Sequence, residues 1–585
     1  MKKYQPQDIR HKFLLLGLFL LFLVFFTISL SSILFLFGIP VNLISFFLAA
    51  VLATLLTCLA GVKYFKFRLF NMFFIIFIGI IIFSFSLFLN SITIETTWDG
   101  NWYHKNAVGL LKNGWNPTRE SARDFYISNR NPIKISHEKS QKLIYENHYA
   151  KGAWIFASNI YKLTGNIETG HSINLIIMVA TFCLLVFLLL CKISIIPSIL
   201  ISAITVFNPI SAPQLFLFYN DGLLGLLVVD AIIALILIVS QRNKIYSTIG
   251  LTIFFITTTI LANIKFTGLV FLFLFSLTFF VYMIITPKLR KTIAKKMLLV
   301  GFCSVLFSVA IVGFSPYISN INNGFHPLHP LAGKDKIDIM TGNSPKEFAN
   351  YNKLLIPLPF VKSIFSKLDN FSYSSDKKTE LKIPFTISES ELINLKTVDA
   401  RISGNGIFFS GLFLISIVVI FIWLIKGYKA KSIDFKISIC IIVPLILIVF
   451  IFKEMWWARY FPFIYITVSL AMYILWQSKK EFSKMLFYGL FFVGFINSYL
   501  LFAPNFESGI KMARLSSCGD ILNHKTVFYK TSHKIFYGTF FNVLDCRGNV
   551  SSEINFLPAK KEANIQNYQS TIVVPGYMEV FYEKK

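Results

Sequence analysis

The sequence predicts an all-α polytopic membrane protein, and three observations lead to this prediction. Of the 585 residues, 55% are hydrophobic and only 15% are charged, whereas soluble domains carry about 25% charged residues. Apolar stretches of roughly 20 residues recur along the chain, and each is long enough to cross about 30 Å of hydrocarbon. These stretches must be helices, because the bilayer core contains no water to satisfy a non-helical backbone.

About thirteen transmembrane helices are expected from these stretches. The basic N-terminal segment precedes an apolar run that ends near residue 37. This run exceeds the apolar region of about 7–15 residues found in signal peptides, so we expect it to be retained as the first span. The spans are predicted near residues 13–37, 39–60, 69–91, 171–190, 193–208, 222–240, 246–264, 267–286, 297–315, 406–425, 437–452, 460–476 and 484–502.

The basic residues predict the orientation of the chain. Lys and Arg number 56 against 29 Asp and Glu, and they concentrate in alternate short loops. Short basic loops mark the cytoplasmic side, which predicts a multi-pass protein of the cell (plasma) membrane with a cytoplasmic N-terminus and an extracytoplasmic C-terminus. This distribution explains the net charge of +27. No nucleic-acid binding is expected, since no basic domain with a reading motif is present.

Two large loops and a tail are predicted outside the membrane. A transmembrane domain would cover residues 1–502, with extracytoplasmic loops at 92–170 and 316–405. Residues 503–585 would form a small exterior α/β domain, because β-branched and aromatic runs alternate there with turn residues. Cys518 and Cys546 share this tail, and the sequence leaves open whether they form a disulfide. The other five cysteines lie in or beside spans.

The first large loop opens on the stretch TTWDGNWYHKNAVGLLKNGWNP. A helix is predicted from Asp99 to about Asn113, because this stretch contains no proline and is followed by a stop signal at Gly114 and Pro117. In one interpretation Asp99 is the N-cap of this helix, a role worth about 1 kcal/mol. In the other, its carboxylate lies with Tyr103 and His104 in a substrate site and acts as a general base or holds a divalent cation. The two interpretations are compatible.

The same loop continues with HYAKGAWIFASNIYKLTG. Helical spacing after His148 and Lys151 predicts a second amphipathic helix on the membrane surface. Simple packing explains the spacing, and His148 is equally interpretable as a hydrogen-bonded loop residue; in a site, both residues would bind substrate. Further along, His326 and His329 form an H-x-x-H pair without a third or fourth ligand nearby, which favours loop structure over a metal site.

Polar residues recur at the predicted outer ends of later spans. Asn220 and Asp221 precede the sixth span, Lys265 lies between two spans, and Arg459 follows a tryptophan pair in EMWWARYFP. Snorkelling to the interface would explain Lys265. A lipid phosphate would suit both cations, and the planar fork of Arg459 matches a pair of phosphate oxygens. Asp230 lies deeper in the sixth span and should face the bundle interior, since an unpaired charge in lipid is costly.

The order of these pieces resembles the GT-C superfamily of membrane glycosyltransferases, which includes protein O-mannosyltransferases, oligosaccharyltransferase catalytic subunits and lipid A aminoarabinose transferases. The matching pieces cover most of the chain: TTWDGNWYH, HYAKGAWIFASNIYKLTG, NPISAPQLFLFYNDG, NIKFTGL and WWARYFPF. The resemblance implies a GT-C-like fold and an enzyme that moves a sugar from a polyprenyl-phosphate donor to a cell-envelope glycan, lipid or protein acceptor. Asp99 matches the first-loop acid of the family, and Lys265 and Arg459 match its lipid-phosphate contacts.

Metal dependence stays open at this point. Many members of the family carry adjacent acids in the first loop, whereas Gly100 follows Asp99 here and Glu95 lies four residues before it. If the enzyme uses a divalent cation such as Mg²⁺ or Mn²⁺, Asp99 and Asp221 are the candidate ligands.

Two other functions are compatible with the sequence, a polysaccharide polymerase and a non-enzymatic transporter or flippase of lipid-linked sugars. Polymerases usually carry their large exterior loops later in the chain and richer in Arg. Transporters place ionisable residues along a pathway through the membrane, and Asp230 is nearly alone within the predicted spans. The sequence contains no Walker motif, which argues against an ATP-driven pump.

Overall fold

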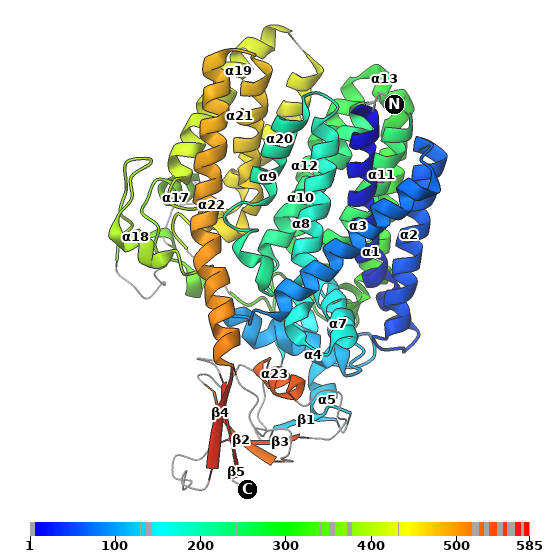
Figure 1. Ribbon diagram of the computed structural model, residues 1–585, viewed down its shortest axis with the longest axis vertical. Coiled ribbons are helices and arrows are strands. Elements are labelled where there is room, and N and C mark those ends of the chain that lie inside the picture. The colour runs from blue at the N-terminus through cyan, green and yellow to red at the C-terminus, as the bar shows by residue number, and fades with distance from the viewer. Residues whose placement is uncertain are drawn as a thin grey trace.

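The computed structural model describes most of the chain, and helices dominate it (Figure 1). The described residues are 6–128, 130–135, 143–240, 244–338, 341–349, 357–370, 377–399, 401–430, 432–516, 526–531, 538–546, 554–558, 568–574 and 578–583.

Within the described residues, eleven helices are long and apolar enough to cross a membrane. Two shorter apolar helices, α9 (Ile195–Val206) and the run Pro462–Gln477 that contains α21 (Ile466–Gln477), match the remaining two predicted spans. Every predicted span therefore coincides with an apolar helix. The eleven long helices are built on α1 (Pro6–Leu36), α2 (Leu43–Phe65), α3 (Leu69–Ser91), α8 (Ser172–Leu189), α10 (Asp221–Ser240), α11 (Lys244–Ala262), α12 (Phe266–Ile285), α14 (Lys295–Phe307), α19 (Phe409–Ala430), α20 (Ile433–Ile451) and α22 (Glu481–Leu515).

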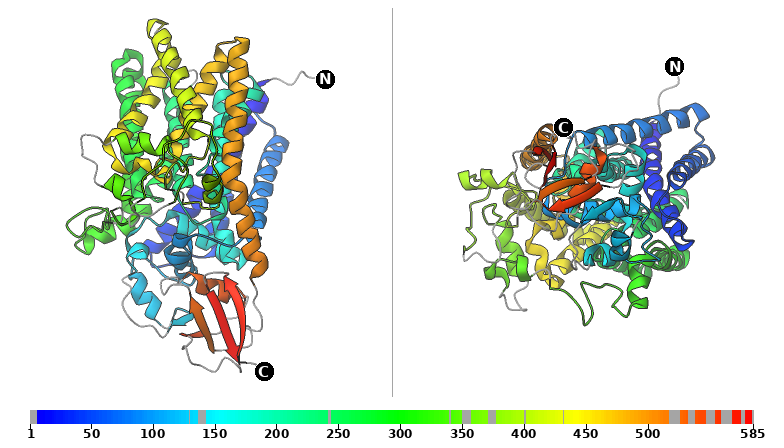
Figure 2. Two further views of the ribbon diagram at one scale, coloured as in Figure 1. Left: turned by 90° about the vertical axis from the view of Figure 1, so that its left-hand side faces the viewer. Right: turned by 90° about the horizontal axis from the view of Figure 1, so that it is seen from below.

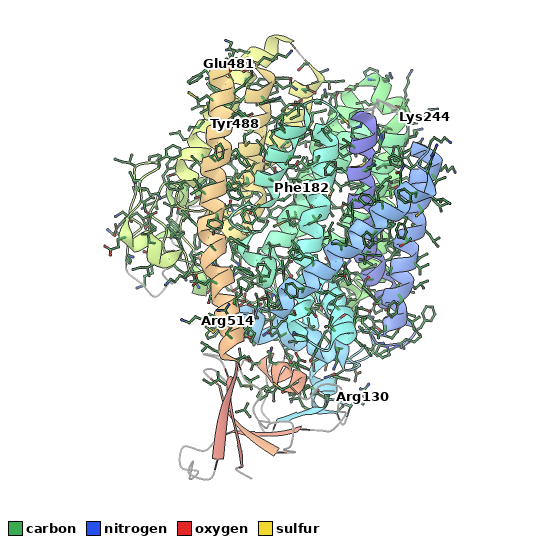
Figure 3. All side chains as sticks on the ribbon, in the orientation of Figure 1. Arg130, Phe182, Lys244, Glu481, Tyr488 and Arg514 are labelled. Atoms are coloured by element: carbon green, nitrogen blue, oxygen red, sulfur yellow. The ribbon has the colours of Figure 1, made fainter. Side chains whose placement is uncertain are left out.

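The two ends of the bundle carry its charged side chains. Lys244 and Glu481 lie at one end and Arg130 and Arg514 near the other, with Phe182 between them (Figure 3). The start of α1 lies at the first of these ends, and the first-loop helices α4 (Lys105–Lys112) and α7 (Gly152–Thr164) lie at the opposite one (Figure 1). This separation is what the predicted alternation of spans requires; which end faces the cytoplasm stays a prediction.

The core of the bundle surrounds α10, which is almost completely buried. Its Asp230 is 0% exposed and accepts a hydrogen bond through Oδ2 from the hydroxyl of Thr181 on α8. This acid faces the bundle interior, as the sequence predicts, because lipid offers a carboxyl group no partner.

The first loop folds into short helices, of which α4 and α7 match the two predicted ones. They are the π-helix η1 (Gly100–His104), α4, α5 (Ala122–Ile127), α6 (Ile144–His148), α7 and the 3-10 helix η2 (Ile167–His171). The predicted stop at Gly114 is confirmed, since α4 ends at Lys112 and Gly114 has a φ of +111° that favours glycine.

The first loop and the C-terminal tail together build one five-stranded sheet. The strands are β1 (Ile133–Ile135), β2 (Thr526–Thr531), β3 (Ile554–Pro558), β4 (Tyr568–Val574) and β5 (Met578–Glu583), in the order β1-β3-β2-β5-β4. β3 pairs in parallel with β1 and β2, and β5 pairs antiparallel with β2 and β4. Both views in Figure 2 place these strands beyond one end of the bundle, next to the first-loop helices.

The C-terminal tail is thus joined to the first loop through β1, the edge strand that the first loop contributes. It also docks through α23 (Thr539–Asp545), whose Phe541 packs so closely on Gly109 of α4 that a Cβ there would lie 2.2 Å from the ring. α22 continues past the predicted domain boundary at residue 502 and ends at Leu515. Cys546 takes part in a disulfide, whereas Cys518 lies outside the described residues.

The second large loop runs along the side of the bundle. Its described elements are η6 (Phe314–Ile318), α15 (Ser319–Asn322), η7 (Thr341–Asn343), α16 (Lys346–Ala349), α17 (Pro357–Ile364) and α18 (Glu389–Asn394). Figure 1 shows α17 and α18 beside the membrane helices, well away from the sheet. The loop returns to the bundle through residues 395–399, which include Asp399, and 401–408.

Candidate active site

Arg459 gathers three carboxylates from distant parts of the chain. It lies on the short helix η10 (Ala458–Tyr460), between α20 and α21. Its Nη1 donates to Asp399 Oδ1 at 2.7 Å, its Nη2 lies 3.3 Å from Asp99 Oδ2, and its Nε lies 3.1 Å from Asp221 Oδ2. The first loop, the start of α10 and the second loop therefore meet at one guanidinium.

A second cation joins this group. Lys265, the residue before α12, forms an ion pair with Asp221 through Oδ1, and its Nζ lies 4.7 Å from the centre of the Tyr460 ring. Its ammonium thus has a carboxylate partner at the bundle end, a contact that snorkelling alone does not require. We call the five residues Asp99, Asp221, Lys265, Asp399 and Arg459 the charged cluster. Three acids and two bases give it a formal charge of −1.

Aromatic rings enclose the guanidinium. Its carbon lies 4.7 Å from the centre of the Tyr219 ring, 5.1 Å from that of Trp457 and 5.5 Å from that of Tyr460. Such cation–π contacts are strongest where water is excluded. Trp456 and Trp457 are 4% and 3% exposed, so both rings pack inside the protein next to Arg459 rather than at its surface.

Asp99 is a partly accessible acid of the cluster and does not cap a helix. Its side chain is 22% exposed, its backbone is already helical, and it makes no capping hydrogen bond. The N-cap interpretation is therefore wrong, because the carboxylate turns toward Arg459. Only Oδ2 takes part in that contact; Oδ1 has no hydrogen-bond partner among the described residues. Burial raises the pKa of Asp99, Arg459 opposes the rise, and the negative charges of Asp399 and Asp221 add to it.

Three tyrosines form the floor beside Asp99. The Tyr103 ring lies 4.9 Å from that of Tyr145 and 5.7 Å from that of Tyr149, centre to centre. Burial raises the pKa of Tyr103 well above its ordinary value, and the negative charge of Asp99 raises it further. Tyr103 thus lies near Asp99, as predicted from helical spacing, and keeps its hydroxyl proton.

The surroundings of His104 do not suit a general base. It is 5% exposed, and its Nδ1 accepts a hydrogen bond of 2.7 Å from the indole Nε1 of Trp154. Burial lowers the pKa of His104 to about 3. The ring is therefore neutral near pH 7 and fixes α7 against η1.

His148 and Lys151 lie outside the charged cluster and hold the loop together. His148 shares a hydrogen bond of 2.6 Å between Nδ1 and Asn320 Oδ1, and its ring packs on His329. Lys151 donates through Nζ to the backbone oxygens of Asn147 at 2.8 Å and Tyr149 at 3.0 Å. Burial lowers the pKa of His148 to about 4 and that of Lys151 to about 7. His148 is thus hydrogen-bonded within the fold at the end of α6, and it also lines a polar cleft.

Asn220 and the two histidines of the H-x-x-H pair are not members of the charged cluster. Asn220 is half-buried next to Asp221, and its carbonyl accepts from the backbone N–H of Leu224 at the start of α10. His326 accepts through Nδ1 from the backbone N–H of Leu328, and His329 packs on His148 and Phe325. The H-x-x-H pair is thus part of a folded turn, as its missing ligands suggested.

Glu95 explains why Gly100 follows Asp99. The Glu95 side chain is 1% exposed, accepts from the backbone N–H and the hydroxyl of Thr97, and accepts from the backbone N–H of Phe218 at 2.6 Å. A Cβ on Gly100 would lie 2.2 Å from this side chain. An acid next to Asp99, as in many GT-C sequences, therefore has no room in this chain.

The first loop also borders a polar cleft, which no residue of the charged cluster lines. It has a volume of about 660 Å³ and opens between the first loop and the segment η6–α15. Its lining includes His148, which precedes Tyr149 in the chain. Other lining residues are Asp124, Asn147, Asn320, Asn322, Asn323 and Phe325.

The cluster does not fit a divalent-cation site. No group of three His, Cys, Asp or Glu side chains arranged to hold a metal exists in the described part of the chain. Asp99, Asp221 and Asp399 each contact the guanidinium of Arg459, which takes the central position that a cation would need.

Asp399 is the member of the cluster that the sequence reasoning missed. It lies in the second loop, 60 residues before its partner Arg459 in the chain. No motif or periodicity surrounds it, so nothing short of the tertiary structure distinguishes it from the other acids of that loop. No family model, curated protein or solved structure matches this chain.

Proposed function

We propose that this protein is a membrane glycosyltransferase that moves a sugar from a polyprenyl-phosphate donor to a hydroxyl acceptor of the cell envelope. The observation that carries the proposal is the pairing of Asp99 with Arg459 at one end of an apolar helix bundle. A partly accessible carboxylate and a guanidinium 3.3 Å apart supply the two groups that such a transfer needs, a base for the acceptor and a cation for the phosphate.

The reaction proceeds by displacement at the anomeric carbon. Asp99 accepts the proton of the acceptor hydroxyl through Oδ1, the oxygen that Arg459 leaves free. The acceptor oxygen forms a bond to the anomeric carbon, and the bond between that carbon and the phosphate oxygen breaks. The electron pair of the broken bond leaves with the polyprenyl phosphate, whose charge Arg459 and Lys265 stabilise.

The phosphate must replace a carboxylate at Arg459. Asp399 is the most exposed of the three, at 26% against 22% for Asp99 and 3% for Asp221. Asp399 is therefore the partner that gives way, while Asp221 stays paired with both cations.

Transfer from a radiolabelled polyprenyl-phosphate sugar into membranes tests the proposal. We expect Asp99→Asn to lower the transfer rate roughly 100-fold or more, because the amide cannot accept the proton. Asp434→Asn is the matched control: Asp434 is a half-exposed acid at the start of α20 and pairs with Lys192. Equal transfer by wild type and Asp99→Asn at matched protein levels would remove Asp99 as the base, and no transfer by any of the three would contradict the donor class.

A further inference from the structure

The second loop exposes an unusual number of large apolar side chains. Within thirteen residues, six of them are exposed, and Ile383 and Ile393 reach 75% and 71%. We call residues 381–393 the apolar segment. Its exposed members are Leu381, Ile383, Phe385, Ile387, Leu392 and Ile393.

Two of the three charged side chains of the same segment point inward, and the third, Glu389, is exposed. Lys382 and Glu391 form an ion pair of 2.6 Å, and their side chains are 2% and 1% exposed. Lys382 also donates to the backbone oxygen of Ile407, and Glu391 accepts from the backbone N–H groups of Leu368 and Ser388. Water-facing loops show the opposite arrangement, with charges outside and apolar groups inside. The segment is built for apolar surroundings.

The apolar segment continues the lipid-facing side of a membrane helix. Phe385 packs against Gly411 near the start of α19, where a Cβ would lie 2.3 Å from the ring. Leu414, Val418 and Phe421 on the same helix are exposed as well, and α19 is one of the helices long and apolar enough to cross a membrane. Figure 1 places α18, the end of the segment, at the flank of the bundle.

We propose that the apolar segment is immersed in the lipid bilayer, next to the outer part of α19. The occupant of this surface is the hydrocarbon of the bilayer, because the exposed apolar side chains are continuous with the lipid-facing residues of α19. The exposed acid of the segment, Glu389, is the first residue of α18. The buried ion pair Lys382–Glu391 closes the polar side of the segment against the loop. This proposal does not depend on the reaction that the protein catalyses.

Immersion would also fix the position of Asp399. Asp369 and Ile402 exchange backbone hydrogen bonds of 3.2 and 2.9 Å, which tie the two ends of the loop together. The backbone N–H of Leu368, next to Asp369, donates a hydrogen bond to the Glu391 carboxylate of the apolar segment. A segment anchored in lipid therefore holds Ile402, and with it the nearby carboxylate of Asp399, at the boundary of the bilayer.

Fluorescent labelling of the full chain in lipid vesicles tests this placement. Ile383→Cys and Ile393→Cys are labelled with a polarity-sensitive nitrobenzoxadiazole dye in a Cys303→Ser background, since Cys303 is exposed among the free cysteines of the described residues. Both sites are so exposed that no packing is lost. Phe421→Cys on α19 is the lipid-facing control, and Lys377→Cys, half-exposed just before the segment, is the aqueous control.

We expect the dye at both sites of the segment to emit at shorter wavelength than at position 377 and to lose fluorescence when the vesicles contain doxyl-labelled lipid, as at position 421. Emission and quenching equal to those at position 377 would overturn the proposal. Blue-shifted emission without quenching by the lipid would also overturn it, because it would show a protein partner or a second copy on this surface.

Discussion

At the scale of single residues, Arg459 determines the arrangement of the site. Its guanidinium donates hydrogen bonds to Asp399 and Asp99 and forms an ion pair with Asp221, so it contacts carboxylates from three different segments. A lysine offers a single point charge and cannot hold this geometry. The burial of the cluster makes each contact stronger than it would be in water and makes the loss of a partner costly.

Arg459→Lys should reduce both donor binding and turnover. We expect transfer to fall on the order of 100-fold, with a higher KM for the lipid-linked donor, because the planar fork can no longer hold two phosphate oxygens. Kinetics with varied donor in proteoliposomes measure this. Arg130→Lys is the control, since Arg130 is 58% exposed and pairs with Glu120. Equal kinetics for both variants would contradict the assigned role of Arg459.

The pH dependence of transfer should report on Asp99. Because the pKa of Asp99 is raised, activity should increase with pH as its carboxyl loses the proton, and the acid limb should lie above the ordinary range of aspartate. The negative charge of Asp399 contributes to that rise, so Asp399→Asn should move the acid limb to lower pH. A pH–rate profile of the two proteins measures the shift; an unchanged or higher limb in Asp399→Asn would argue against Asp99 as the titrating base.

Gly100 should tolerate no side chain. Gly100→Ala places a Cβ 2.2 Å from the buried Glu95 side chain, and overpacking of this kind costs about 1–3 kcal/mol. We expect a lower thermal denaturation temperature for this variant. Gly301→Ala on α14 is the control, since nothing lies within 4 Å of a Cβ there. If both variants unfold at the wild-type temperature, the close packing of Glu95 on Gly100 is not a constraint.

At the scale of elements, the first loop and the C-terminal tail form one unit. Glu168 of η2 forms an ion pair with Lys105 of α4 and accepts from the amide of Asn542 on α23 at 2.8 Å. Asp545, at the end of α23, accepts from the hydroxyl of Tyr161 and from the backbone N–H of Ile167. These buried contacts bring α23 onto the helices that carry Asp99.

The docking of α23 should depend on pH. Burial raises the pKa of Asp545 to about 7, above its value in an unfolded chain, so protonation favours the docked state. This stabilisation is complete below the ordinary aspartate pKa and is lost as the pH rises through about 7. Hydrogen exchange of residues 539–545, corrected for intrinsic rates, should therefore be slower at about pH 5 than at about pH 8. Asp545→Asn should remove most of this difference; its persistence would assign the effect to another group.

The elements that composition defines could be predicted, and the contacts between distant segments could not. Apolar runs predict the membrane helices because lipid leaves the backbone no alternative, and Gly114 predicts a helix end because of its backbone freedom. The same local reasoning fails at Asp99, where Arg459, distant in sequence, outweighs capping. It also misses Asp399 and the pairing of β1 with β3, since both depend on loop closures that leave no periodic signal.

At the scale of the whole molecule, the charged cluster lies where the first loop meets the bundle, because Asp99 directly precedes η1 and Asp221 begins α10. Figure 1 shows the first-loop helices α4 and α7 at the end of the bundle that faces the sheet. Asp99, Asp221, Lys265 and Arg459 were expected together because charge patterning assigned them to one side of the membrane, and the structure joins them directly. His104, His148 and Lys151 belong to the supporting packing instead.

The orientation of the chain in the membrane follows from the same charge pattern. We expect a tag at the N-terminus to be protected from protease in intact cells and a tag after residue 585 to be cleaved, because short basic loops stay in the cytoplasm. Protease accessibility before and after permeabilisation measures this. An exposed N-terminal tag would contradict the predicted side of the charged cluster.

The most direct test of the central claim is a product balance with purified protein in proteoliposomes. With a polyprenyl-phosphate sugar labelled in both sugar and phosphate, and an envelope acceptor fraction, wild type should release one polyprenyl phosphate for each sugar joined to acceptor, and Asp99→Asn should do neither. Appearance of intact donor on the other side of the bilayer, without a cleaved sugar–phosphate bond, would contradict glycosyl transfer and identify the protein as a flippase.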